Sequence, residues 1–113
     1  MEQNLPRLLI QAVVVPSMNA QTLTVSGPVT IYEVSEWREQ FLASVKTGTN
    51  LNVDLHTSGP WDAAGLQLLI SLIMTGQQRD CHIRFQLVPK VCRELAMRAG
   101  LQKWLAEYSD SEL

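Results

Sequence analysis

Two alternating segments on either side of a long apolar helix constrain the fold of this chain most. Residues 51–55 and 83–87 each alternate apolar and polar side chains, which is typical of half-buried strands. Between them, Asp62 stands where a helix N-cap belongs, ahead of an apolar helix that reaches about Gln78. A strand, a helix and a second strand in this order favour parallel pairing through a right-handed crossover. The sequence therefore predicts an α/β domain with a parallel pair at its centre.

The first third of the chain supplies further elements. Residues 7–15 are rich in apolar and β-branched side chains, and residues 22–26 alternate, so we expect a hairpin there. Thr30 and Glu33 have the spacing of a capping box at the start of a helix that stops near Gly48. A second strand–helix–strand crossover follows from this arrangement. The apolar face of this helix is expected to comprise Val34, Trp37, Phe41 and Val45.

The last third is expected to be helical. Pro89 opens a helix, Gly100 closes it, and residues 101–105 form a short final helix. From Glu107 onward the chain is polar, and we expect it to fray. The predicted order is β-β-α-β-α-β-α-α. Strands covered on both faces are almost continuously apolar, whereas these strands alternate, so the helices should cover mainly one face.

Size and charge exclude several classes of protein. A chain of 113 residues with 46% hydrophobic content is long enough for one compact domain. The net charge is −2 and the nine basic residues are scattered, so we expect no nucleic-acid partner. The apolar stretch 66–74 is too short to span a bilayer and the N-terminus lacks a signal-peptide pattern, so we expect a cytoplasmic protein without direct membrane insertion.

The cysteines do not indicate a metal or a disulfide framework. Cys81 and Cys92 are the only two, and buried free thiols are the common state for such a pair. The adjacent Cys81 and His82 lack the spacing of a metal site. We therefore expect neither metal nor cofactor.

One polar cluster raises the question of an enzyme. Asp54, His56 and Ser58 lie close together in sequence, but residues so near one another at a strand end rarely form a triad, and no nucleophile-elbow motif is present. The glycines of residues 59–65 lack the lysine and hydroxyl of a phosphate-binding loop. Polar loop residues are the favoured interpretation. Trp61, in the same loop, either packs beneath it or contacts a partner.

Residues 53–69 carry a family resemblance. A strand ends at Asp54, a second aspartate follows eight positions later at Asp62, and the helix begins Asp-Ala-Ala-Gly-Leu. This segment resembles the central motif of STAS domains, the anti-sigma-factor-antagonist family. Its continuation, Ala-Gly-Leu-Gln-Leu-Leu, is similar to that of small STAS proteins found beside bacterial chemotaxis systems. The resemblance extends from about Leu23 to Leu105.

The resemblance implies a fold and a non-catalytic role. The expected fold is a STAS-type α/β fold, with a mixed four- to five-stranded sheet and helices mainly on one face. Residues 1–113 would form a single STAS domain whose folded core covers about residues 7–106. Such domains are regulatory and bind proteins, and phosphorylation of a Ser or Thr after the second aspartate releases the partner. Ala63 occupies that position here and has no hydroxyl, so phosphorylation there is impossible.

The same resemblance implies a binding site at the start of the second helix. The hydroxyls of Thr57 and Ser58, in the loop before this helix, are expected to be either alternative phosphoacceptors or turn and capping groups. Leu68 lies away from the stripe that suits the sheet, and either packs against the third helix or belongs to an apolar docking strip. The expected partner-binding residues are Trp61, Asp62, Ala63, Ala64, Gly65, Leu66 and Leu68.

Three functions remain open from the sequence. The first is a signalling domain whose partner is a kinase-like ATPase-fold regulator or a chemotaxis component. The second is the STAS subunit of a lipid-transport ABC complex, docked on its ATPase. The third is a small enzyme or ligand-binding protein that uses His56, Asp54 and Ser58. The expected oligomeric state is a monomer or a homodimer.

Overall fold

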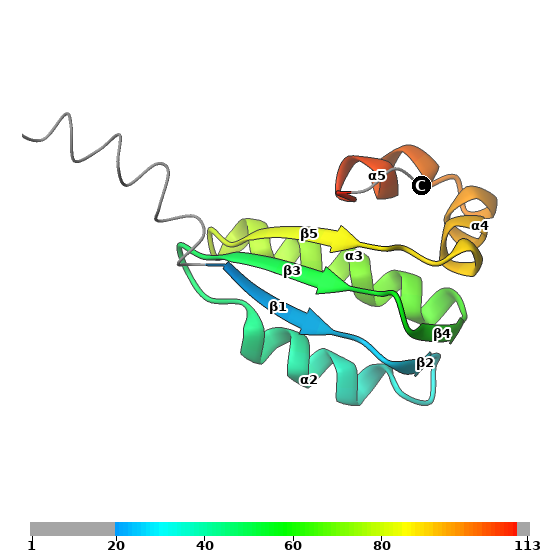
Figure 1. Ribbon diagram of the computed structural model, residues 1–113, viewed down its shortest axis with the longest axis horizontal. Helices are drawn as coiled ribbons and strands as arrows, with labels where there is room; N and C mark the ends of the chain where they lie inside the picture. Colours follow the sequence, from blue (N-terminus) through cyan, green and yellow to red (C-terminus); the bar gives the residue numbers. More distant parts are fainter. Residues whose placement is uncertain (1–19, 111–113) are drawn as a thin grey trace, which may run out of the picture.

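The computed structural model describes residues 20–110 (Figure 1). The predicted strand within residues 7–15 lies outside this range, so the expected hairpin is not tested. The remaining element order agrees with the sequence prediction, apart from two additional short strands. The elements are β1 (Ala20–Thr24), β2 (Gly27–Val29), α2 (Val34–Ser44), β3 (Asn50–Asp54), β4 (Ser58–Trp61), α3 (Ala63–Gln78), β5 (His82–Gln86), α4 (Lys90–Arg98) and α5 (Gln102–Glu107).

The main sheet confirms the predicted parallel crossovers. Its strand order is β1-β3-β5, and both pairings are parallel. Leu23, Val53 and Phe85 lie opposite one another across the three strands. Val53 and Phe85 are fully buried, as the alternating pattern requires. All three strands therefore end at the same edge of the sheet (Figure 1).

A second, smaller sheet stands where the sequence predicts only turns. Gly27 and Pro28 directly follow the predicted strand 22–26 and are residue types that usually end a strand, but here they belong to β2, which pairs in parallel with β4. Both segments leave the carboxyl edge of the main sheet side by side, and pairing satisfies their backbone groups. The N–H of Val25 donates to the carbonyl of Asp54 at 2.9 Å, and the N–H of Gly27 donates to that of Thr57 at 3.0 Å. The described residues thus contain five strands in two sheets, and every pairing is parallel.

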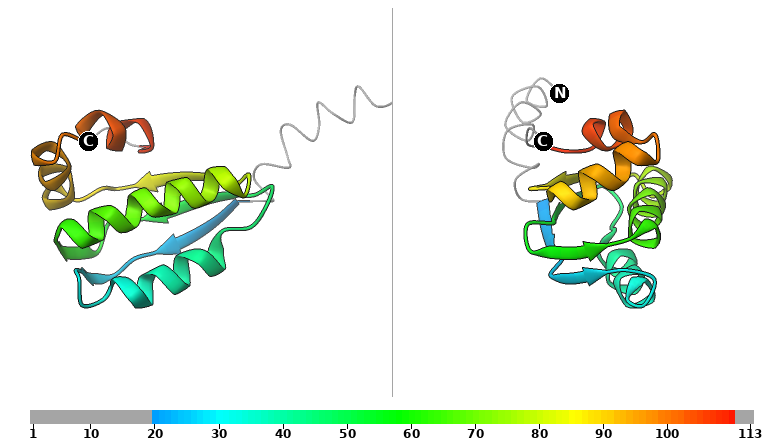
Figure 2. Two further views of the ribbon diagram at one scale, coloured as in Figure 1. Left: turned by 180° about the vertical axis from the view of Figure 1, so that it is seen from behind. Right: turned by 90° about the vertical axis from the view of Figure 1, so that its right-hand side faces the viewer.

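The helices cover mainly one face of the sheet, as predicted. Figure 2 shows α2 and α3 packed side by side on this face. The strand residues that face the helices, such as Leu51 and Ile83, are buried, whereas their neighbours Asn52 and Arg84 are partly exposed. The buried side chains of both sheets and of α2, α3, α4 and α5 form one hydrophobic cluster.

The polar segment after α5 does not fray. The N–H of Phe85 donates to the carbonyl of Tyr108 at 2.8 Å, and the N–H of Asp110 donates to the carbonyl of Phe85 at 2.9 Å. Arg84 forms an ion pair of 2.6 Å with Asp110. Residues 108–110 therefore lie along the outer edge of β5 like a fourth strand. The prediction of a frayed tail from Glu107 is wrong as far as Asp110.

Candidate functional site

The start of α3 is held by one carboxylate. Asp62 has an extended backbone, and its Oδ1 accepts the backbone N–H groups of Ala64 at 3.0 Å and Gly65 at 3.2 Å, which confirms it as the N-cap. Its Oδ2 accepts the backbone N–H of Ile31 at 3.0 Å. The same side chain thus caps α3 and fixes the turn between β2 and α2 against it.

In that turn, only one of the two hydrogen bonds of the predicted capping box forms. Glu33 Oε1 accepts the backbone N–H of Thr30 at 2.9 Å and also the Thr30 hydroxyl. The reciprocal bond does not form, because the Glu33 N–H donates to the Thr30 carbonyl instead. As a result α2 begins at Val34, one turn later than expected. The closed turn leaves Ile31 65% exposed and Tyr32 89% exposed.

This exposed turn lies next to the first residue of α3. Ala63 is exposed, and the bond from Ile31 to Asp62 places the turn directly beside it. We call Ile31, Tyr32 and Ala63 the α3-start surface. Sequence reasoning found Ala63 but assigned Ile31 and Tyr32 to a helix. An apolar pair inside a capping-box pattern was the signal that could have found them.

Trp61 and Gly65 support this surface from below. Trp61 is 7% exposed, and its Nε1–H donates to the hydroxyl of Ser58 at 2.9 Å, so it packs beneath the loop. A Cβ at Gly65 would lie 2.3 Å from the carbonyl oxygen of Val29 and 2.7 Å from the Trp61 ring. Glycine is required there because α3 approaches this backbone too closely for any side chain.

Some of the other expected contact residues are accessible to a partner and others are buried. Asp62 and Ala64 are partly exposed, whereas Leu66 and Leu68 are buried. Leu68 is only 7% exposed and lines a narrow gap together with Leu42 of α2. The interpretation of Leu68 as an exposed docking strip is therefore wrong. Leu68 is a packing residue, and the helix it faces in this gap is α2 rather than the expected third helix.

The side chains suspected of catalysis have separate partners. Asp54 Oδ1 accepts the backbone N–H of His56 at 2.9 Å, which is a local turn contact. The Ser58 hydroxyl donates to the carbonyl of Leu55 at 2.7 Å and accepts the Trp61 Nε1–H. The imidazole of His56 is exposed. This arrangement stabilises the loop and does not align a nucleophile with a base.

The two alternative phosphoacceptors differ in accessibility. Ser58 is partly buried, and both of its hydrogen bonds are made within the loop. Thr57 is exposed, and its Oγ1 lies 2.9 Å from the Oγ of Ser26. Of the two, the Thr57 hydroxyl is the one that a kinase could reach. Its phosphorylation stays a prediction.

The thiols are free and buried, as expected. Cys81 and Cys92 form no disulfide, and burial raises the pKa of the Cys92 thiol to about 12. Within residues 20–110, no three His, Cys, Asp or Glu side chains cluster as metal ligands would. None of the helices in that range is long and apolar enough to cross a membrane.

The fold and the site define a class of protein. It is a small α/β domain that presents a capped helix start at the carboxyl edge of a parallel sheet. The chain belongs to the STAS domain family, since the family model described as "Mlab, STAS domain" matches residues 14–107. STAS domains form a non-enzymatic regulatory and protein-interaction fold.

Solved structures show the same fold at low sequence identity. A sulfate transporter family protein from Wolinella succinogenes superposes with a TM-score of 0.65 and is 15% identical, over 80% of this chain and 75% of that chain. The STAS domain of a SulP transporter from Vibrio cholerae gives a TM-score of 0.60 at 15% identity, over 80% and 72% of the two chains. No curated protein sequence matches the chain significantly.

Proposed function

We propose that this chain is a protein-docking STAS domain that binds its partner through the α3-start surface. The observation that carries the proposal is the bond between Asp62 and Ile31, because it holds two exposed apolar side chains beside Ala63. Exposed apolar residues grouped on a rigid surface are typical of protein-interaction sites. The partner would cover Ile31, Tyr32 and the first turn of α3.

The charge pattern of α3 supports the same surface. The helix from Ala63 to Gln78 contains no charged residue, although several of its side chains face solvent. The cores of protein interfaces are depleted in charge and enriched in aromatic residues. Ala63 and Gln67 on the exposed side, with Tyr32 next to them, have this composition. A partner with an uncharged or weakly charged contact area would fit here.

Ala63 makes the docking independent of phosphorylation at this position. A phosphate on the first residue of α3 would add up to about two negative charges where a partner contacts the helix. Alanine cannot carry that group. The domain therefore stays competent for binding, and any control has to act elsewhere, for example at the exposed Thr57.

We place the partner among the ATPase subunits of transport complexes rather than among signalling regulators. The similar solved structures are a sulfate transporter family protein and a SulP transporter STAS domain, so both come from transport proteins. The family model carries the name Mlab rather than that of an anti-sigma-factor antagonist. These likenesses support the lipid-transport ABC alternative better than a chemotaxis or sigma-factor role.

Binding measured with purified proteins tests the surface. The chain would be titrated into the ATPase subunit of a candidate ABC complex and, separately, into a kinase-like regulator from the same bacterium. We expect Ala63→Asp to weaken binding at least about tenfold, because it adds charge within the interface. Ala63→Ser, the neutral control, should bind within about threefold of the unchanged protein because it adds no charge. An acidic residue in the first helical turn does not destabilise the helix, so loss of binding would not reflect unfolding.

Two further variants separate the surface from the rest of α3. Tyr32→Ala should weaken binding, whereas Met74→Ala, which also removes an exposed apolar side chain, lies about three turns along α3 and should not. Unchanged binding by both Tyr32→Ala and Ala63→Asp would refute the docking site. Binding to the regulator but not to the ATPase subunit would favour the signalling function over the transport function.

A further inference from the structure

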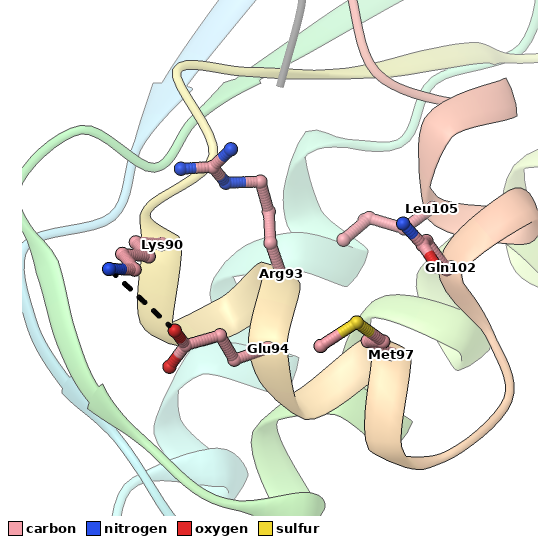
Figure 3. Close-up of a pocket in the computed structure, with 6 residues that line it drawn as sticks. All are labelled: Lys90, Arg93, Glu94, Met97, Gln102 and Leu105. Carbon is pink, nitrogen blue, oxygen red and sulfur yellow. Dashed lines mark ion pairs between the residues drawn. The ribbon is translucent and has the colours of Figure 1, made fainter.

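A pocket between α4 and α5 shares no residue with the α3-start surface. It is a partly open pocket of about 340 Å³, within the range of about 300–1,000 Å³ that small-molecule sites have. Its lining residues come from α4 and α5, and those of α4 follow one side of the helix (Figure 3). The six residues are Lys90, Arg93, Glu94, Met97, Gln102 and Leu105.

One of these residues, Arg93, carries a buried donor that has no acceptor. The Nε of Arg93 is inaccessible to solvent and has no hydrogen-bond partner within the described part of the chain. A buried donor on a charged group costs more when it is unsatisfied than a neutral one does. The Nε–H of Arg93 is therefore a donor that would be stabilised by a hydrogen-bond acceptor.

The charges around Arg93 favour an anion. Lys90 also faces the pocket, and the single carboxylate there, Glu94, lies 3.9 Å from the Lys90 ammonium. One acid against two bases leaves a net positive charge at the rim. The planar guanidinium group of an arginine matches a carboxylate or phosphate, which accepts two parallel N–H bonds.

The other side of the pocket is apolar. Met97 and Leu105 line it opposite the charged residues, and Leu105 points from α5 toward α4 (Figure 3). Met97 is 54% exposed although it is a large apolar side chain. A ligand with a short apolar part would cover it. Polar and apolar groups are thus separated within one small pocket.

We propose that this pocket binds a small organic anion, with its acidic group on Arg93 and its apolar part against Met97 and Leu105. The Nε is covered in this structure, and no hydrogen bond within the described residues holds it in place. The guanidinium group therefore has to turn toward the pocket, where the bound anion supplies its acceptor. The positive rim attracts the anion before it binds. The site gives the domain a means of responding to a metabolite that is separate from its protein partner.

Hexanoate is a suitable probe, because it joins a carboxylate to a short apolar chain. Titration into the isotopically labelled protein, followed by amide chemical shifts, should give saturable changes in α4 and α5. The neutral analogue 1-hexanol should give none that saturate. Arg93→Gln should weaken hexanoate binding about tenfold or more, since it removes the charge-assisted bond. Arg98→Gln, an equal change of charge at an exposed site on the same helix, should leave it within about twofold, since an exposed charge interacts weakly.

A second pair of variants keeps Arg93 in place. Met97 is exposed, so Met97→Glu should fold normally, yet it puts a carboxylate in the pocket and should abolish hexanoate binding. Met97→Gln, its neutral counterpart, should retain most of it. The proposal is overturned if hexanoate gives no saturable shifts. It is equally overturned if Arg98→Gln weakens binding as much as Arg93→Gln, or if 1-hexanol binds as well as hexanoate.

Discussion

Asp62 and Ile31 are joined by a bond of 3.0 Å between the Oδ2 of the carboxylate and the backbone N–H of the isoleucine. The two residues lie 31 positions apart, and the bond links the end of β4 to the turn before α2. Because Oδ1 is occupied by the first N–H groups of α3, one side chain serves two elements. This relationship explains why an aspartate, rather than any other N-cap residue, is suited to the position.

Replacing Asp62 tests this double role. In Asp62→Ser the side chain has a single oxygen. That oxygen can still cap α3, but the bond to Ile31 should be lost. Asp62→Ala loses both and should lower the free energy of unfolding by about 1–2 kcal/mol, with Asp62→Ser lying between it and the unchanged protein. Urea denaturation measures all three. Equal stability of the alanine and serine variants would mean that the cap contributes nothing.

The glycine at position 65 should be intolerant of a single methyl group. In Gly65→Ala the new Cβ would lie 2.3 Å from the carbonyl oxygen of Val29, which cannot move without disturbing β2. We expect a loss of about 3 kcal/mol or more, as for severe overpacking. The comparison is Ala63→Gly, which changes one methyl group in the same turn of α3 at an exposed site and should cost no more than about 1 kcal/mol. A Gly65→Ala protein as stable as the Ala63→Gly protein would contradict the packing described.

Local chemistry explains which parts of the site the sequence could predict. An N-cap such as Asp62 satisfies donors two and three residues away, so the pattern is visible within one stretch of chain. The exposure of Tyr32 and the burial of Leu68 depend instead on how α2 lies against α3, and no local pattern encodes that. The pairing of β2 with β4 could not be predicted either, because both short strands contain glycine and proline, which are typical of turns.

The segment after α5 shows the same limit. Residues 108–110 have the polar composition of a frayed end, and local propensity gives no reason to order them. They are ordered because Arg84, far away in sequence, donates to the carbonyls of Glu107 and Ser109 at 2.7 Å each and to the Asp110 carboxylate. An arginine on the polar face of a strand looks like an ordinary solvent-exposed residue in sequence.

Cys92 should be inert in the folded protein. Its thiol is fully buried, and burial raises its pKa to about 12, so almost no thiolate forms at pH 8. We expect iodoacetamide at pH 8 to leave Cys92 unmodified in the native protein and to alkylate it fully in guanidinium chloride, as peptide mass mapping would show. Rapid alkylation of the native protein would mean that α4 opens readily from the sheet.

The ion pair between Arg84 and Asp110 should make the end of the chain sensitive to acid. The hydrogen bond from Arg84 is the main cause that lowers the pKa of Asp110 below its ordinary value of 3.8, and it outweighs the opposing effect of burial. A carboxylate with a lowered folded-state pKa contributes stability above its unfolded-state pKa, and this contribution is lost as the pH falls through the folded-state value. Both side chains are about 40% exposed, so solvent screening keeps the effect small, below about 1 kcal/mol.

The measurement compares the unchanged protein with Asp110→Asn from pH 7 to pH 2. At neutral pH the unchanged protein should have the higher melting temperature, and the difference should shrink as the pH falls below the ordinary pKa of 3.8 and through the lowered folded-state pKa. Added salt should also reduce it, because the pair is partly exposed. Amide hydrogen exchange at Phe85 and Asp110 gives a local readout, since their N–H groups form the bonds between β5 and this segment. Equal melting temperatures of the two proteins at pH 7 would mean that Asp110 orders the segment through its backbone alone, and a difference that does not depend on pH would mean that the carboxylate charge is not its cause.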